Sequence, residues 1–214
     1  MVSFHGADNK HPTTTHDLIQ QCDDLSLINE LSSAVIHKKP FKDILSLLSR
    51  SVGNIFNSHG VAVYLLGQDN DSLEMQRYTL PVKIRNIVEK LMAIKIPQVT
   101  IKRSSESFYF KALSSGKPLL INGTNDIKKL LYEFTDNKVL RKYVSKIQNV
   151  IGIKNIVIFP LVSGKTALGI MDISRETAFS NAEIKRLEYI VSQVTEEILC
   201  YRATLEKEEL LQKL

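Results

Sequence analysis

The fold is decided by the stretch Ile158-Phe159-Pro160-Leu161-Val162-Ser163-Gly164-Lys165-Thr166-Ala167-Leu168-Gly169-Ile170-Met171. Apolar residues dominate on both sides of Ser163-Gly164-Lys165, and Gly164 can supply the positive φ that a tight turn requires. We therefore expect strands over residues 155–162 and 167–173, joined as an antiparallel hairpin.

Further strands are predicted upstream of this hairpin. Residues 61–66 and 73–80 show strand patterning on either side of Gln68-Asp69-Asn70-Asp71, a turn sequence, which indicates a second antiparallel hairpin. Shorter apolar runs at 96–101 and 118–121 add two candidate strands. The sequence thus provides enough strands for one antiparallel sheet.

Helical periodicity surrounds the strands. The first helix is expected to begin near Asp17 and to place one apolar residue per turn on a single face. A second helix is expected over 41–55, short helices over 84–91, 108–113 and parts of 125–149, and a last helix after Ser180, which forms a capping box with Glu183. The face of the first helix is predicted to consist of Leu18, Cys22, Leu25, Ile28, Leu31 and Val35.

The last helix carries a heptad pattern, which favours pairing with another helix. Its first half is expected to pack on the sheet, and the part beyond Ile198 to contact a partner. We expect this helix to continue beyond Leu214 into an output domain. The predicted dimer interface combines both end helices: Leu18, Cys22, Leu25, Val194, Ile198, Tyr201 and Leu205.

Composition excludes several classes of protein. The 214 residues are 43% hydrophobic and 24% charged, as in an ordinary globular domain. No apolar run is long enough to span a bilayer, and the polar residues 1–15 resemble a disordered tail rather than a secretion signal. We therefore expect a cytoplasmic location without direct membrane contact. Two cysteines, Cys22 and Cys200, do not make a disulfide framework.

Four segments resemble the GAF family: 41–45 continuing into 60–66, 112–122, 158–171, and 179–183 followed by an apolar helix. The resemblance implies an α+β fold, related to the PAS fold, with a central antiparallel sheet of five to six strands. The N- and C-terminal helices would cover one face, and short helices and loops the other, where they form a small-molecule pocket. We expect residues 16–201 to form the domain and 202–214 to start a coiled-coil signalling helix.

Pocket residues are predicted in the middle segment, because aromatic walls with few polar groups suit a small ligand. Ordinary core packing is the alternative interpretation of each residue. No cofactor can be named from the sequence. The candidates are Phe108, Tyr109, Phe110, Asp126, Tyr132, Phe134, Arg141 and Lys142.

Several catalytic or cofactor motifs are incomplete. Gly164-Lys165-Thr166 lacks the earlier glycine of a phosphate-binding loop, since position 159 is Phe. No paired His or Cys spacing predicts a metal site. Asn137-Lys138 matches part of the cyclic-nucleotide pattern of the family, but no Asp-Glu dipeptide follows it. The two cysteines fall on framing helices, so thiol chemistry in the pocket has no candidate.

The middle of the chain is basic: residues 81–154 carry 15 Lys and Arg against 5 Asp and Glu. Lys138, Arg141, Lys142 and Lys146 share a helical spacing that suits a solvated face, a nucleic-acid patch or a pocket for an anionic ligand. We predict a small-molecule-sensing, dimerising domain of a signal-transduction protein, such as a histidine kinase. The alternatives are a catalytic GAF-type enzyme and a nucleic-acid-binding regulator.

Overall fold

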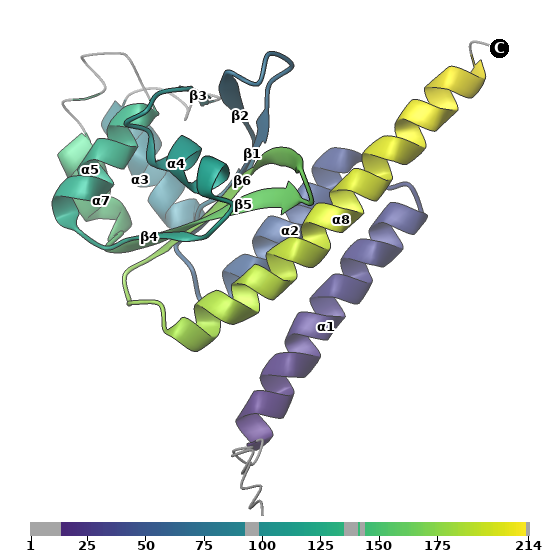
Figure 1. The fold of residues 1–214 in the computed structure, drawn as a ribbon. Helices are drawn as coiled ribbons and strands as arrows, with labels where there is room; N and C mark the ends of the chain where they lie inside the picture. Colours follow the sequence, from purple (N-terminus) through teal and green to yellow (C-terminus); the bar gives the residue numbers. More distant parts are fainter. Residues whose placement is uncertain (1–13, 93–98, 135–140, 142–143, 213–214) are drawn as a thin grey trace, which may run out of the picture.

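A computed structural model describes residues 14–92, 99–134, 141 and 144–212 (Figure 1). Its centre is a six-stranded sheet in which every neighbouring pair is antiparallel, with the order β3-β2-β1-β6-β5-β4. This confirms the predicted α+β architecture. The strands are β1 (Gly60–Leu66), β2 (Ser72–Thr79), β3 (Thr100–Lys102), β4 (Leu119–Ile121), β5 (Asn155–Ser163) and β6 (Thr166–Arg175).

The predicted hairpin of β5 and β6 is present and lies inside the sheet, between β1 and β4. Gly164 has a φ of 57° at the turn, which confirms the predicted conformation. Gly169 serves a different purpose, because β1 passes very close to it. A Cβ atom at this position would stand 2.0 Å from the carbonyl oxygen of Tyr64. Only glycine therefore permits β6 and β1 to pair at this point.

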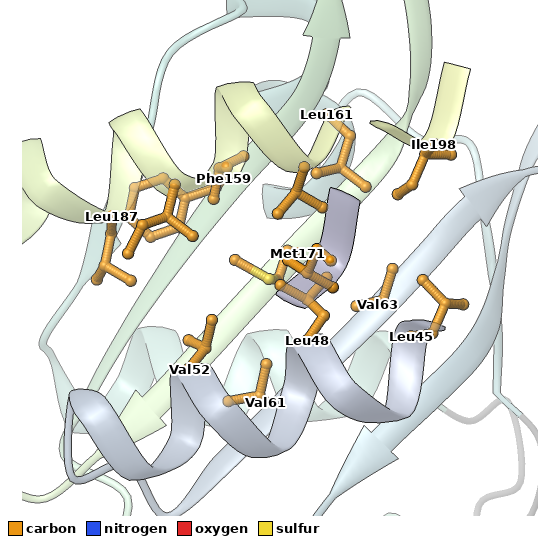
Figure 2. Close-up of a cluster of buried hydrophobic side chains, with 14 of the residues drawn as sticks. Leu45, Leu48, Val52, Val61, Val63, Phe159, Leu161, Met171, Leu187 and Ile198 are labelled. Carbon is orange, nitrogen blue, oxygen red and sulfur yellow. The ribbon is translucent and has the colours of Figure 1, made fainter. Parts of the chain in front are cut away.

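One face of the sheet is covered by three helices: α1 (Thr15–Ile36), α2 (Phe41–Ile55) and α8 (Asn181–Gln212). Figure 2 shows how side chains from α2 and α8 meet those of the central strands in a buried cluster. Its labelled members are Leu45, Leu48, Val52, Val61, Val63, Phe159, Leu161, Met171, Leu187 and Ile198. The predicted gathering of both terminal helices on the same face is confirmed.

Helices α1 and α8 lie side by side and run in the same direction (Figure 1). The Arg186 guanidinium donates two hydrogen bonds to the Asp24 carboxylate, at 2.7 and 2.8 Å. Ser32 pairs with Glu197 further along the helices, and Lys38 pairs with Glu208 beyond that. These rising residue numbers on both helices establish the parallel orientation.

The residues predicted for a dimer interface divide between buried and exposed positions within the single chain. Val194 and Ile198 are buried inside the chain, because α8 packs against α1 and the strand β5 within one core. Tyr201 is half-buried and stacks on Phe41, with ring centroids 5.4 Å apart. These three side chains are thus engaged within the chain, whereas the side chain of Leu205 lies outside the described residues.

On α1 the predicted apolar face divides into two. Leu31 and Val35 are buried, together with Leu27 and Ala34. The other members predicted to contact a second copy, Leu18, Cys22 and Leu25, are exposed. The sequence period was correct, but two faces of the helix carry apolar residues and only one packs on the domain.

The opposite face of the sheet is covered by α3 (Val82–Met92), α4 (Phe108–Ser115), α5 (Thr124–Glu133) and α7 (Val144–Ile151).

The expected tail falls mostly on residues 1–13, outside the described range, and α1 starts with a capping box between Thr14 and Asp17. No described helix has the length and apolarity needed to cross a bilayer.

Candidate ligand cavity

A cavity of about 180 Å³ lies between the sheet and the middle helices. The strands β1, β2, β5 and β6 form its floor, and α3, α4, α5, α7 and the loops beside them form its walls. Most of the lining side chains are apolar, including Val88, Leu130 and Ile156. Such a lining favours a ligand that buries hydrocarbon surface.

Asp172 is the one carboxyl group among the described residues of this lining. It lies on β6 and is buried. Its carboxylate accepts a hydrogen bond from the hydroxyl of Tyr109, at 2.8 Å, and another from the backbone N–H of Ala62. A buried carboxylate with two donors is held in a fixed position, so it can act as a specific contact for a ligand.

Three aromatic rings surround this carboxyl group. Tyr64 on β1, Tyr109 on α4 and Phe134 after α5 form a cluster, in which ring centroids lie 5.5 to 6.3 Å apart. A side-chain hydrogen bond also joins Tyr64 to Tyr109. The rings come from both sides of the cavity, so a ligand that separates them would also move α4 and α5 relative to the sheet.

Tyr109 is positioned by a cap at the start of α4. The Glu133 carboxylate accepts from the hydroxyl of Ser107 and, at 2.9 Å, from the backbone N–H of Phe108. Ser107 in turn accepts from the N–H of Phe110. These bonds satisfy the free amides of the first helical turn and connect it to the end of α5.

The electrostatic environment shifts the titration of these groups. Burial raises the pKa of Asp172 from 3.8 to about 7, although the hydrogen bonds from Tyr109 and Ala62 oppose the change. Burial likewise raises the pKa of the Tyr64 and Tyr109 hydroxyls, and the Asp172 carboxylate adds to the effect. The tyrosines are therefore neutral hydrogen-bond donors at neutral pH, while Asp172 is poised between its two forms.

Two of the predicted pocket residues, Tyr109 and Phe134, line the cavity. The other described candidates lie outside its lining. Phe110 is buried beneath the guanidinium of Arg103, Phe108 lies under Lys111, and Tyr132 under Arg141. Asp126 pairs with Lys129 at the surface. Lys142 lies outside the described residues.

Sequence reasoning missed Asp172 and Tyr64. Along their strands, both residues alternate with side chains that face α2 and α8, and this alternation could have identified them. In β1, Val61, Val63 and Leu65 face α2 and α8. Because side chains alternate along a strand, Tyr64 must face the opposite side, where the cavity lies. An aspartate within an otherwise apolar strand is also unusual, because an unpaired carboxylate is costly to bury.

The two cysteines and the exposed Lys146 lie outside the cavity lining. Cys22 and Cys200 are exposed on α1 and α8, across the sheet from the cavity. The described residues contain no group of His, Cys, Asp and Glu that could bind a metal ion. Of the basic residues singled out above, Lys146 is exposed on α7, and Lys138 lies outside the described range.

The comparisons with known proteins agree with this architecture. The family model of the GAF domain matches residues 40–198. This chain belongs to the GAF domain family. No curated protein sequence matches the chain.

Solved structures of other GAF domains show the same fold at low sequence identity. The GAF domain of the Acinetobacter phosphoenolpyruvate-protein phosphotransferase is 12% identical, with a TM-score of 0.56, and the match covers 84% of this chain and 94% of that one. A domain of a putative two-component sensor histidine kinase from Sinorhizobium meliloti 1021 is 13% identical, with a TM-score of 0.52 and coverage of 79% and 98%.

The free methionine-R-sulfoxide reductase of Neisseria meningitidis, solved with its substrate, is 12% identical, with a TM-score of 0.57 and coverage of 85% and 91%. Thus both signalling domains and an enzyme share the fold of this GAF domain. The likeness establishes the fold alone, and the site must decide between these functions.

Proposed function

We propose that this GAF domain is a non-catalytic sensor of a signal-transduction protein, and that it binds a small, largely apolar molecule carrying an amine or another hydrogen-bond donor. The observation that carries the proposal is an apolar cavity whose described lining contains one carboxyl group, that of Asp172, fixed by Tyr109. The exposed positions of both cysteines, far from this cavity, support a binding role over thiol catalysis.

The size of the cavity limits the ligand. At about 180 Å³ it is close to the engineered protein cavity of roughly 150 Å³ that binds benzene. A ligand with one ring, or an aliphatic chain of similar volume, fills this space. A nucleotide would need a much larger opening.

The charge of the lining determines which polar group the ligand carries. A protonated amine next to Asp172 would pair with the carboxylate and offset the cost of its burial. An anion would face the same carboxylate, and the described lining offers no Lys, Arg or His to balance it. The geometry therefore favours a cationic or neutral donor over the anionic ligand considered from the sequence.

The proposal is tested with two ring compounds of similar size and opposite charge. We expect 2-phenylethylamine to raise the midpoint of thermal unfolding, and phenylacetate to leave it unchanged. Asp172→Asn should abolish the effect of the amine, whereas Asp126→Asn, outside the cavity, should retain it. Equal shifts by both compounds, or an equal response of both variants, would contradict the assigned role of Asp172.

A direct connection leads from the cavity to the long helix. Asp172 is followed on β6 by Arg175, which is buried and donates two hydrogen bonds to Glu183 at the start of α8, at 2.7 and 2.8 Å. A ligand that displaces β6 would thus shift the base of α8. It controls an output only if it binds one arrangement of α8 more tightly than another.

We propose further that the domain acts as a parallel homodimer within a histidine kinase or related receptor. The support is an exposed apolar stripe on α1, where Leu18 and Leu25 are 52% and 53% exposed and Cys22 lies between them. These residues recur at intervals of four and three, the spacing of a two-helix seam. The described parts of the chain leave this stripe uncovered.

Cysteine cross-linking tests this dimer. Because a parallel dimer joined through this stripe brings the two Cys22 side chains together, mild oxidation should give a disulfide-linked dimer. Cys22→Ser should prevent the cross-link, whereas Cys200→Ser should not. A native chain that sediments as a monomer at high concentration would rule out the homodimer without affecting the ligand proposal.

A further inference from the structure

A second and larger cleft lies beside α2, on the face of the sheet that carries α1, α2 and α8. It has a volume of about 690 Å³ and runs between the second half of α2, the end of β2 and the first turn of α3. Arg77 pairs across the sheet with Val63, whose side chain belongs to the helix-side core. Since directly paired residues point to the same face, Arg77 faces α2, away from the first cavity.

The lining of this cleft is strongly cationic. Arg50 comes from α2, Arg77 from β2 and Arg85 from α3, and His59 lies nearby. Among the residues that the structure describes, no Asp or Glu contributes to the lining. Three guanidinium groups in one concave surface produce a positive potential that concentrates anions.

The three arginines differ in their partners within the described part of the chain. The side chain of Arg50 donates to the carbonyl oxygen of Ser46, one helical turn away. Those of Arg77 and Arg85 are exposed and make neither an ion pair nor a hydrogen bond within the described ranges. Their donors are thus available to a ligand in the cleft.

A neutral hydroxyl group, that of Ser58, lies beside the three arginines of the cleft. Ser58 lines the cleft, and its hydroxyl oxygen is buried beside it with no hydrogen-bond partner among the described residues. An unsatisfied hydroxyl costs free energy in the empty state. Rotation about its Cα–Cβ bond would let it donate to an anionic oxygen in the cleft.

From these contacts we infer that the cleft is a second binding site, for a small molecule that carries a phosphate or diphosphate group. Guanidinium groups bind phosphate oxygens through paired hydrogen bonds, and several of them match its multiple charge. The volume is within the range of roughly 300–1,000 Å³ that is typical of small-ligand sites. The cleft shares the end of β2 with the apolar cavity, but its cationic lining suits a ligand of opposite character.

Calorimetric titration with inorganic pyrophosphate at constant ionic strength tests the site. We expect saturable binding of one pyrophosphate per chain. The triple variant Arg50→Gln, Arg77→Gln, Arg85→Gln should weaken this binding roughly tenfold or more. A matched triple variant, Lys42→Gln, Lys117→Gln, Lys165→Gln, removes the same charge from exposed positions outside the cleft and should bind as the native chain does.

The single variant Arg77→Gln changes one exposed residue of the cleft, so it carries less risk to folding than the triple variant. It should weaken pyrophosphate binding severalfold relative to the native chain. Absence of saturable binding, or equal losses in the cleft and control variants, would overturn the proposal. Tighter binding of a single-stranded oligonucleotide, with a steep dependence on salt, would also overturn it in favour of a nucleic-acid surface.

Discussion

The hydroxyl of Tyr109 lies 2.8 Å from the carboxylate of Asp172, and this bond connects α4 to β6 across the cavity. It links the middle segment of the chain to the central sheet. The same carboxylate is also the proposed contact for the ligand. A ligand that takes over this contact therefore also changes how the middle segment is held.

Replacing Tyr109 by Phe should lower the free energy of unfolding by about 1–2 kcal/mol, because it removes a donor from a buried carboxylate. The loss should be larger at pH 8 than at pH 5, since hydrogen bonds to the ionised form are stronger. Urea denaturation at both pH values measures it. Tyr132→Phe, on an exposed ring outside the cavity, is the control and should have little effect.

Asp172 makes the stability of the domain depend on pH. Its pKa is raised in the folded state, from 3.8 to about 7, so folding favours the protonated form. The resulting stability is fully present below pH 3.8 and is lost as the pH rises through about 7. Asp172→Asn should remove this decline, and denaturation midpoints of the variant and the native chain between pH 4 and 8 reveal the difference. Parallel curves for the two proteins would show that Asp172 titrates normally.

Glu183 should give the opposite dependence. Its hydrogen bonds with Arg175 and Ser180 lower its pKa from 4.5 to about 2. The stability that it contributes is present above pH 4.5 and lost as the pH falls through about 2. Glu183→Gln should destabilise the domain at pH 7 and reduce this acid sensitivity. Glu188→Gln, an exposed position on the same helix, serves as the control in acid titrations followed by circular dichroism.

Gly169→Ala should destabilise the fold by several kcal/mol, on the order of the largest single-residue effects. The added methyl group would clash with the backbone of β1 near Tyr64 and Leu65, and backbone atoms cannot move aside cheaply. Gly164→Ala meets no atom within 4 Å, so it should cost only the strain of a positive φ, about 1–2 kcal/mol. Thermal unfolding compares the two variants, and similar losses would refute the role given to Gly169.

Ile198→Asp should unfold the chain rather than separate a dimer, because Ile198 is only 1% exposed within the single chain. Leu25→Asp should leave the fold intact, since Leu25 is exposed. If the proposed dimer forms, only Leu25→Asp yields a folded monomer. Sedimentation combined with circular dichroism distinguishes these outcomes, and a folded, monomeric Ile198→Asp protein would restore the interface predicted from the sequence.

Local patterns predict the strands well, because their side-chain period and turn residues are short-range features. The turn at Gly164 and the capping box of Ser180 and Glu183 both appear as expected. The partner of a helix face is a different matter. The heptads of α8 predict that an apolar surface is needed at Val194 and Ile198, but only the tertiary structure shows that the chain itself provides it.

The site was predicted less completely, for a related reason. Tyr109 and Phe134 were found because aromatic residues cluster in the middle segment. Asp172 and Tyr64 come from the central strands, where an apolar pattern indicates core rather than ligand. Their role becomes visible only when α4 is placed above the sheet and the Tyr109 hydroxyl meets the carboxylate.

We propose above all that Asp172, buried in the lining of the apolar cavity, binds the polar group of a ligand. Carbon-13 NMR of the Asp172 side-chain carboxyl, titrated with and without saturating 2-phenylethylamine, tests it most directly. We predict a pKa of about 7 in the free chain and a clearly lower pKa with the amine, because a bound cation favours the carboxylate. An ordinary pKa for the free chain, unchanged by the amine, would contradict the account.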